Sequence, residues 1–121
     1  SHGMQPHEGV IYTYGAVIYN PSGGEIPHHL LVHEMTHMRQ QNFNDEDAKK
    51  WWERYFLEPH FRIQQESEAY ANQYSQICRE IHDRNHQVRI LYDLAGMLSG
   101  PIYGNVITHM GALKLIKKTH K

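Results

Sequence analysis

The segment His33-Glu34-Met35-Thr36-His37 holds the residues whose types and spacing point most directly to chemistry. Residues four apart share one face of a helix, so the imidazoles of His33 and His37 can bind one Zn²⁺ if the segment is helical. Glu34 directly follows the first histidine, where its carboxylate can take a proton from a water molecule at the metal. This pattern is typical of zinc-dependent hydrolysis of peptide bonds.

A catalytic zinc takes three protein ligands and leaves one position open, so the two histidines need a third partner. The chain has a single cysteine, Cys78, which excludes an internal disulfide and a thiolate-built zinc site. The remaining ligand types are histidine and carboxylate. Glu66 and Glu68 are the candidates, because both lie on a segment with helical periodicity.

Helical phase favours Glu66 over Glu68 as the third ligand. The apolar stripe of their segment consists of Ile63, Tyr70, Tyr74, Ile77 and Ile81. At about 100° per residue, Glu66 lies about 60° from the centre of this stripe and Glu68 about 140° from it. We therefore expect Glu66 at the edge of the interior, where a carboxylate is costly unless it is paired or metal-bound. The alternative is an ion pair between Glu66 and Arg62 or Arg39.

Residue patterning indicates a small sheet followed by helices. Val10–Tyr14 and Ala16–Asn20 are rich in Val, Ile and Tyr and predict a hairpin, which must pack on helices because two strands alone are marginal. The expected helices are His28–Gln40, Asp45–Leu57 after an Asn44 cap, about His60–His82, about Gln87–Leu98, and a short one from a Thr108 cap through Lys118. His28–Gln40 is apolar on more than one side, which predicts a central, buried helix. The predicted fold class is α+β.

Composition narrows the classes of partner. A chain of 121 residues with net charge −1 predicts one domain without the basic field of a nucleic-acid binder. No apolar run has the length of a bilayer span, so we expect a soluble, cytoplasmic protein with no membrane partner. Ser1-His2-Gly3 before Met4 is typical of a remnant of tag removal, so the domain is expected to span residues 4–121.

An HExxH helix, followed 29 positions after His37 by Glu66 on a further helix, resembles the gluzincin metallopeptidases. The run Glu66-x-x-Ala69 is similar to the glutamate helix of several gluzincin branches. The small size resembles the minigluzincins, and the wider pattern resembles small metallopeptidase-like proteins encoded by phages and prophages. The residues of this wider likeness are His33-Glu34-x-x-His37-x-x-Gln40, Glu66-x-Glu68-Ala69-Tyr70 and Leu98-Ser99-Gly100-Pro101-x-Tyr103-Gly104-Asn105.

The resemblance implies a minimal zincin-like domain in which His33, His37 and Glu66 hold Zn²⁺. It implies that Glu34 acts as general base in the hydrolysis of a peptide or protein substrate. For a phage-encoded chain, it implies a location in the host cytoplasm or the virion. The resemblance leaves oligomeric state and cleavage specificity open.

Gluzincins commonly add a Tyr, His or Arg that stabilises the oxyanion of the reaction. Tyr103 and His109 are the candidates here, because they lie in or just after a Gly- and Pro-rich loop that can return to the site. Tyr70 stands where several gluzincin branches carry an Asp that supports a ligand histidine, so another group must take that role. The groups that could do so are Gln40, Asn72, Gln73 and a backbone carbonyl.

Three further hypotheses concern how the site is used. The strand Ala16–Asn20 is suited to receive an extended substrate along its edge. The chain could also be latent, with Lys114–Lys121 and His120 plugging the cleft. The alternative function is a catalytically silent, metal-stabilised interaction module, phage-associated if the chain is phage-encoded, in which zinc only fixes the fold.

Overall fold

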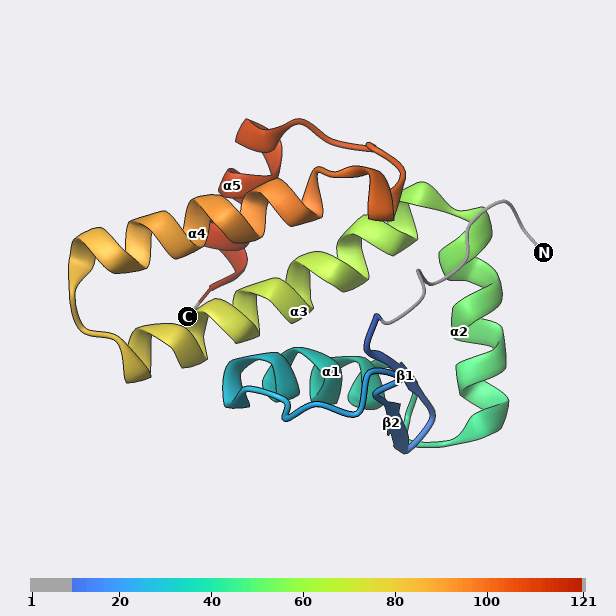
Figure 1. Cartoon of the computed structure of the whole chain (residues 1–121). Helices are drawn as coiled ribbons and strands as arrows, with labels where there is room; N and C mark the ends of the chain where they lie inside the picture. Colours follow the sequence, from blue (N-terminus) through green and yellow to red (C-terminus); the bar gives the residue numbers. More distant parts are fainter. Residues whose placement is uncertain (1–9, 121) are drawn as a thin grey trace.

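The computed structural model describes residues 10–120, in which a small hairpin precedes five α-helices (Figure 1). The elements are β1 (Tyr12–Tyr14), β2 (Val17–Tyr19), α1 (His28–Gln40), α2 (Asp45–Leu57), α3 (Pro59–Glu80), α4 (Arg84–Leu98), the 3-10 helix η1 (Pro101–Tyr103) and α5 (His109–Thr119). This arrangement confirms the predicted α+β class. Within the described residues, every helix is too short or too polar to cross a membrane. The expected tag remnant Ser1–Gly3 and the last residue, Lys121, lie outside the described residues.

Helix α3 lies at the centre of the fold, and the other helices are arranged around it (Figure 1). Helix α1 lies along one side of α3, α4 and α5 lie along the other, and α2 crosses near the N-terminal end of α3. The main apolar core lies between α3, α4 and α5 and continues into aromatic residues of α2. Helices α1 and α3 instead meet through buried polar side chains, which are described below.

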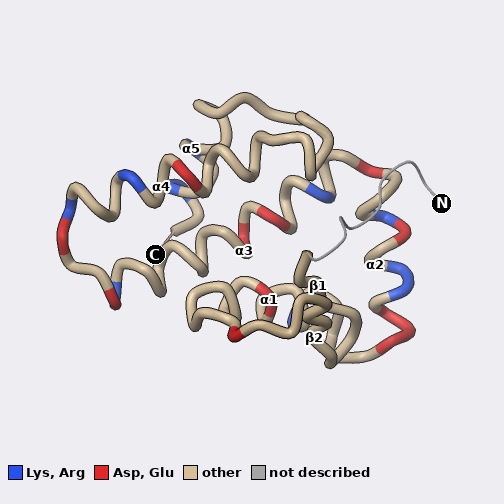
Figure 2. Tube along the Cα trace, viewed as in Figure 1, with Lys and Arg blue, Asp and Glu red and all other residues tan. Residues whose placement is uncertain are grey.

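Capping residues fix several helix starts as the sequence predicts. The backbone N–H of Asp47 donates to the Asn44 side chain at 2.8 Å, and the N–H of Gly111 donates to the Thr108 hydroxyl at 3.0 Å. Acidic residues fill the first turn of α2 and Arg54 stands in its last turn, which suits the helix dipole. Figure 2 shows acidic and basic blocks alternating along this helix.

Other boundaries differ from the predictions. Helix α3 begins at Pro59, because proline is well placed in the first turn of a helix, and it ends at Glu80 before reaching His82. Helix α4 begins at Arg84 instead of Gln87, because the Asp83 side chain caps it by accepting the His86 N–H at 3.1 Å. The two strands are also shorter than predicted, at three residues each.

Helix α1 buries polar residues, contrary to the prediction of a helix buried by its apolar sides. Its buried residues are His33, Glu34, Thr36 and His37, whereas Met35 is 50 % exposed. Buried polar groups are tolerated only when they are hydrogen-bonded, and every buried side-chain N or O atom in the described residues has a partner. The α1–α3 interface is therefore a polar network rather than an extension of the apolar core.

The amide side chain of Gln41 fastens the hairpin to the end of α1. Gln41 is fully buried, donates to the carbonyl of Thr13 at 3.1 Å and accepts the N–H of Gly15 at 2.6 Å. The indole of Trp52 on α2 donates to the same Thr13 carbonyl at 3.0 Å. Gly15 has φ +64° in the hairpin turn, and an added Cβ would lie 2.5 Å from a side-chain oxygen of Asp45. These contacts fix β1 against both α1 and α2.

A buried guanidinium joins α2, α3 and η1. Arg62 on α3 is 4 % exposed and donates to the carbonyls of Tyr55 at 2.8 Å and Phe56 at 3.1 Å. Both carbonyls belong to the last turn of α2, the negative end of that helix. A third bond, of 2.9 Å, reaches the carbonyl of Tyr103 at the end of η1. Arg62 therefore sets the position of Tyr103 relative to α3.

Candidate metal centre

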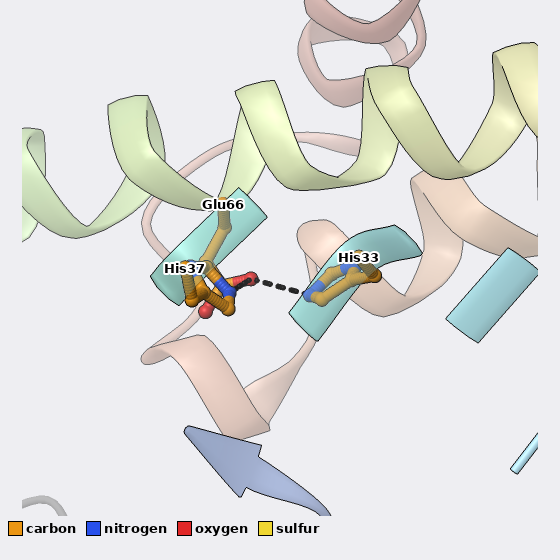
Figure 3. A group of neighbouring side chains, drawn as sticks. All are labelled: His33, His37 and Glu66. Carbon is orange, nitrogen blue, oxygen red and sulfur yellow. Dashed lines mark hydrogen bonds and ion pairs between the residues drawn. The ribbon is translucent and has the colours of Figure 1, made fainter. Parts of the chain in front are cut away.

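His33 and His37 from α1 and Glu66 from α3 converge between the two helices (Figure 3). The Nε2 atoms of His33 and His37 lie 3.1 Å and 3.2 Å from Oε1 of Glu66. All three side chains are buried. The helical phase that favours Glu66 over Glu68 is thereby confirmed, because Glu66 is the glutamate that faces the two histidines.

The ligand atoms of His33, His37 and Glu66 lie within 4.8 Å of one another, and two of their three separations are close to those around a single metal ion. Two ligands of a tetrahedral zinc, each bonded at about 2.0–2.1 Å, lie about 3.3 Å apart. The distances of 3.1 Å and 3.2 Å from the imidazole nitrogens to Glu66 are close to this value. Two imidazoles and one carboxylate suit zinc and other first-row divalent ions. The three residues also leave a coordination position for a non-protein ligand.

Each histidine is oriented by a glutamine amide. Nδ1 of His33 lies 3.0 Å from Oε1 of Gln73, and Nδ1 of His37 lies 2.8 Å from Oε1 of Gln40. An amide oxygen only accepts, so each Nδ1 carries its hydrogen and each Nε2 can present a lone pair to a metal. Two of the predicted supporting groups, Gln40 and Gln73, are thereby confirmed. The third, Asn72, donates to Thr36 instead.

The remaining atoms of Gln40 connect the centre to the surface. Its amide nitrogen donates to the carbonyl of Gln65 at 3.0 Å and to Glu68 at 2.8 Å, which fixes the orientation of the amide. Glu68 is itself paired with Arg39. The alternative ion pairs of Glu66 with Arg39 or Arg62 are therefore wrong, because both guanidinium groups have other partners.

Tyr55 holds the second oxygen of Glu66. Its hydroxyl donates to Oε2 at 2.6 Å, while Oε1 faces the two histidines. Burial and the negative charge of Glu66 raise the pKa of Tyr55, so it stays protonated and acts as the donor. The sequence places Tyr55 only on the core face of α2 and carries no signal of this role.

Glu34 lies beside the three ligands with its two oxygens in different surroundings. Oε1 accepts a hydrogen bond of 2.9 Å from the hydroxyl of Thr13, a residue of β1 that is 1 % exposed. Oε2 lies 4.0 Å from Nε2 of His33. Burial raises the pKa of Glu34, against the opposing pull of the two histidines. One oxygen is thus fixed by Thr13, and the other is available for proton transfer next to the ligand set.

The charges of the ligand residues are strongly coupled. Burial acts to lower the pKa of His37, but the carboxylate of Glu66 outweighs it and raises the pKa to about 9. Burial likewise acts to raise the pKa of Glu66, but the two imidazoles outweigh it and hold that pKa well below its usual range. At neutral pH the metal-free centre is therefore an imidazolium–carboxylate pair.

Metal binding is expected to displace this proton. His37 is protonated below about pH 9 in the metal-free protein, whereas a metal needs the neutral imidazole. At pH 7, zinc binding should release about one proton, and its apparent affinity should rise about tenfold per pH unit up to about pH 9. Isothermal titration calorimetry in two buffers of different ionisation enthalpy measures the released proton. Equal binding enthalpies in the two buffers would contradict the expectation.

A cavity of about 60 Å³ lies at the centre and is lined by His33, Glu34, His37 and Glu66. Tyr103 also lines it, and its hydroxyl lies 2.7 Å from the hydroxyl of Tyr70. Burial raises the pKa of Tyr103, so the phenol stays neutral and can donate a hydrogen bond. Much of the remaining wall comes from apolar side chains of η1, α2 and the residues around β1.

The structure does not bring His109 to this cavity. The Thr108 cap holds His109 in the first turn of α5, where its ring stacks on Tyr92 and its Nε2 contacts the Tyr92 carbonyl at 3.0 Å. The prediction that the loop returns His109 to the site is therefore wrong, because His109 lies against Tyr92 and does not line the cavity. Tyr103, from the same part of the chain, is the candidate that reaches the cavity.

The described part of the predicted plug also lies elsewhere. His120 contacts the hydroxyl of Ser75 at 2.7 Å and packs against the ring of Tyr74, both on α3. Of the described residues 114–120, none lines the cavity. The prediction that this segment plugs the cleft is therefore wrong for residues 114–120.

The strand beside the cavity is β1, not the strand predicted to receive a substrate. Tyr12 and Thr13 of β1 line the cavity, whereas β2 pairs with the other edge of β1 in an antiparallel register that places Thr13 opposite Ile18. No residue of Ala16–Asn20 lines the cavity, so the structure gives no support to this segment as the place where a substrate would bind. Near the cavity, the carbonyl of Thr13 is already occupied by Gln41 and Trp52.

Comparisons of the chain with models of known protein families, with curated proteins and with solved structures gave no match. What the centre can do is therefore inferred from its own residues. It combines a buried two-histidine, one-glutamate ligand set with a carboxylate beside it and a neutral phenol in the cavity wall. That combination suits activation of water and stabilisation of a developing negative charge.

Proposed function

We propose that this chain is a zinc-dependent peptidase with a minimal zincin-like fold. The observation that carries the proposal is the placement of Glu34, which is buried beside the ligand set with one oxygen held by Thr13. A structural zinc site takes four protein ligands and has no use for a buried carboxylate that binds no metal. The gluzincin-like spacing of His33, His37 and Glu66 supports the same function.

In this proposal His33, His37 and Glu66 hold the ion, and the amides of Gln40 and Gln73 orient the two imidazoles. Zinc, when bound, supplies Lewis acidity that lowers the pKa of a coordinated water towards about 7 and polarises a substrate carbonyl. Tyr55 keeps one oxygen of Glu66 engaged, so that the other is directed at the ligand position. The chain thereby presents the ligands already oriented.

Glu34 moves the proton in this proposal. Its Oε2 accepts a proton from the attacking water, and the same oxygen then gives that proton to the amine that leaves when the C–N bond breaks. Burial raises the pKa of Glu34 and so makes its protonated form less costly. This suits a residue that holds the proton of the attacking water until the amine leaves. Thr13 holds Oε1 through both steps.

Tyr103 is the proposed oxyanion donor. The hydroxyls of Tyr103 and Tyr70 lie 2.7 Å apart, and the Tyr70 hydroxyl also donates to Sδ of Met97 at 3.8 Å. In this proposal Tyr70 turns its proton from Met97 to the Tyr103 oxygen, and Tyr103 then donates into the cavity that it lines. The carbonyl of Tyr103 is fixed by Arg62, which limits the movement of its ring. A preorganised donor of this kind stabilises charge that develops during reaction.

Replacing Tyr103 with phenylalanine is expected to lower kcat by about tenfold to hundredfold with little change in KM, because the hydrogen bond to the developing oxyanion is lost together with the contact to the Tyr70 hydroxyl. Steady-state kinetics on a fluorogenic peptide measures both constants. Tyr92→Phe is the matched control, because Tyr92 is exposed on α4 and lies outside the cavity lining. An unchanged kcat in Tyr103→Phe would remove this residue from the mechanism.

The proposed function is tested by metal content and cleavage together. Zinc titration should show about one ion per chain, and mass spectrometry of a mixed peptide library should show cleavage that a chelator stops and added zinc restores. Zinc binding without cleavage would support the metal-stabilised interaction module instead. A failure to bind zinc would contradict the centre itself.

A further inference from the structure

A third histidine continues the face of α1 that carries the two candidate ligands. His29, His33 and His37 follow one another at intervals of four residues, so their side chains lie along one side of the helix. His29 lies in the first turn of α1 and is half-buried. Its Nδ1 lies 3.0 Å from Nε2 of Gln73, the amide whose oxygen faces Nδ1 of His33. Gln73 therefore stands between His29 and a candidate ligand.

The amide of Gln73 couples the proton of His29 to that of His33. An amide nitrogen only donates, so His29 accepts with the lone pair of its Nδ1. The amide oxygen only accepts, so His33 donates from its Nδ1. A half-turn of the amide would exchange these roles, and the hydrogen of a neutral His33 would then lie on Nε2, the atom that faces Glu66. The side of His29 that carries the hydrogen therefore decides whether Nε2 of His33 is free.

The amide of Gln40, which supports His37, does not depend on a proton in this way. Its nitrogen donates to the carbonyl of Gln65 and to the carboxylate of Glu68. A carbonyl and an ionised carboxylate only accept, so they hold the Gln40 oxygen toward His37. An imidazole can accept or donate, according to where its hydrogen lies. The buried amide of Gln73 has such a group as its partner.

We propose that His29 is a positioning residue for the metal centre. By accepting the Gln73 amide hydrogen at Nδ1, it keeps the hydrogen of His33 on Nδ1 and leaves Nε2 of His33 free for the metal. A bound metal in turn holds the hydrogen of His29 on Nε2, because coupling between two sites is reciprocal. The inference rests on the metal binding in the proposed function, but not on peptide cleavage.

Zinc affinity tests the proposal directly. His29→Leu removes the acceptor at similar volume and should raise the zinc dissociation constant about tenfold, as expected when the support of a metal ligand is weakened. His29→Asn offers an oxygen near the place of Nδ1, so it should restore the affinity to within about threefold of the wild type. His28→Leu is the matched control, since His28 is exposed in the same turn of α1. Competition with a fluorescent zinc chelator measures all four proteins.

A change at Gln73 separates positioning from packing. In Gln73→Glu both oxygens of the side chain can accept, so His33 can donate from Nδ1 whatever group stands at position 29. In that background His29→Leu should change the zinc affinity by less than about threefold, against about tenfold in the wild-type background. Packing by His29 alone predicts the same loss in both backgrounds. Equal losses would therefore overturn the proposal, as would a loss in His29→Leu that His29→Asn does not restore.

Nitrogen-15 NMR of the zinc-loaded protein gives a second measurement, which is independent of affinity and of catalysis. Long-range correlations within each imidazole distinguish protonated from unprotonated ring nitrogens, and the signals lost in His29→Asn identify His29. In the wild type, His29 should carry its hydrogen on Nε2 and none on Nδ1. A hydrogen on Nδ1 of His29 would contradict the proposal, because that nitrogen could not accept from Gln73.

The failure of this inference can be told apart from the failure of the peptidase. If the wild type binds zinc but His29→Leu binds it as tightly as His28→Leu, the role of His29 is wrong and the proposed function stands. If zinc affinity depends on His29 as expected but no peptide is cleaved, only the peptidase is contradicted. A wild type that binds no zinc contradicts both.

Discussion

Replacing Glu34 with glutamine is expected to lower kcat/KM for peptide cleavage by about 10³-fold while the protein retains its zinc. The amide cannot take the proton of the attacking water, whereas its oxygen can still accept the hydrogen bond from Thr13. His33, His37 and Glu66 are unchanged, so the ligand set persists. Steady-state kinetics and zinc analysis on the same preparation measure the two effects separately.

Glu68→Gln is the matched control for this experiment. It makes the same chemical change two residues from Glu66, at a carboxylate on the surface that faces Arg39 and Gln40. Its activity should stay within about threefold of the wild type, because Glu68 contacts the site only through Gln40. Full activity in Glu34→Gln at normal zinc content would eliminate Glu34 as the base. Equal losses in both variants would point to a general effect of charge.

Replacing Arg62 with methionine is expected to lower the free energy of unfolding by about 3–5 kcal/mol. Methionine fills much of the same volume but leaves the buried carbonyls of Tyr55, Phe56 and Tyr103 without their guanidinium donor. Urea unfolding of the metal-free protein, followed by circular dichroism, measures the change without a contribution from bound zinc.

Arg54→Met provides the comparison for Arg62→Met. Arg54 also lies near the end of α2, but it is exposed, where it pairs with Glu58 and lies over the ring of Phe61. Its replacement should cost less than about 1 kcal/mol. If the two variants have the same stability, Arg62 does not have the role described for it.

The convergence of the three candidate ligands could be predicted from sequence because it depends on local helical geometry. The spacing of His33 and His37, and the phase of Glu66 relative to its apolar stripe, hold for any regular helix. The bounds of α1 and α2 were also predictable, since turn and capping residues such as Asn44 act on neighbours in the chain.

The supporting residues could not be predicted in this way. Thr13 reaches Glu34 only because Gln41 and Trp52 dock the hairpin, and no local pattern encodes that docking. Tyr55 occupies a core position like its neighbours, and its bond to Glu66 depends on how α2 crosses α3. His109 was misplaced for the same reason, because the direction in which a loop leaves a helix is not set by its Gly and Pro content.

The prediction from hydropathy that α1 is buried by its apolar sides is also wrong. The expectation that its apolar sides would be buried fails because the interface with α3 is occupied by hydrogen-bonded polar groups. A helix that presents ligands to another helix must turn its polar residues inward, and Met35 is left exposed as a result. Periodicity locates such a helix but does not say which face is the inner one.

The way in which Gln41 meets the hairpin also has a consequence for self-association. A two-stranded sheet has two open edges, and an open edge is a template on which another chain can add a strand. Beside α1, the Gln41 amide receives the N–H of Gly15 and donates to the carbonyl of Thr13, as a peptide group of a third strand would. A side chain thus closes that edge of β1, which protects the two-stranded sheet of the described residues against edge-to-edge aggregation on the side that faces α1.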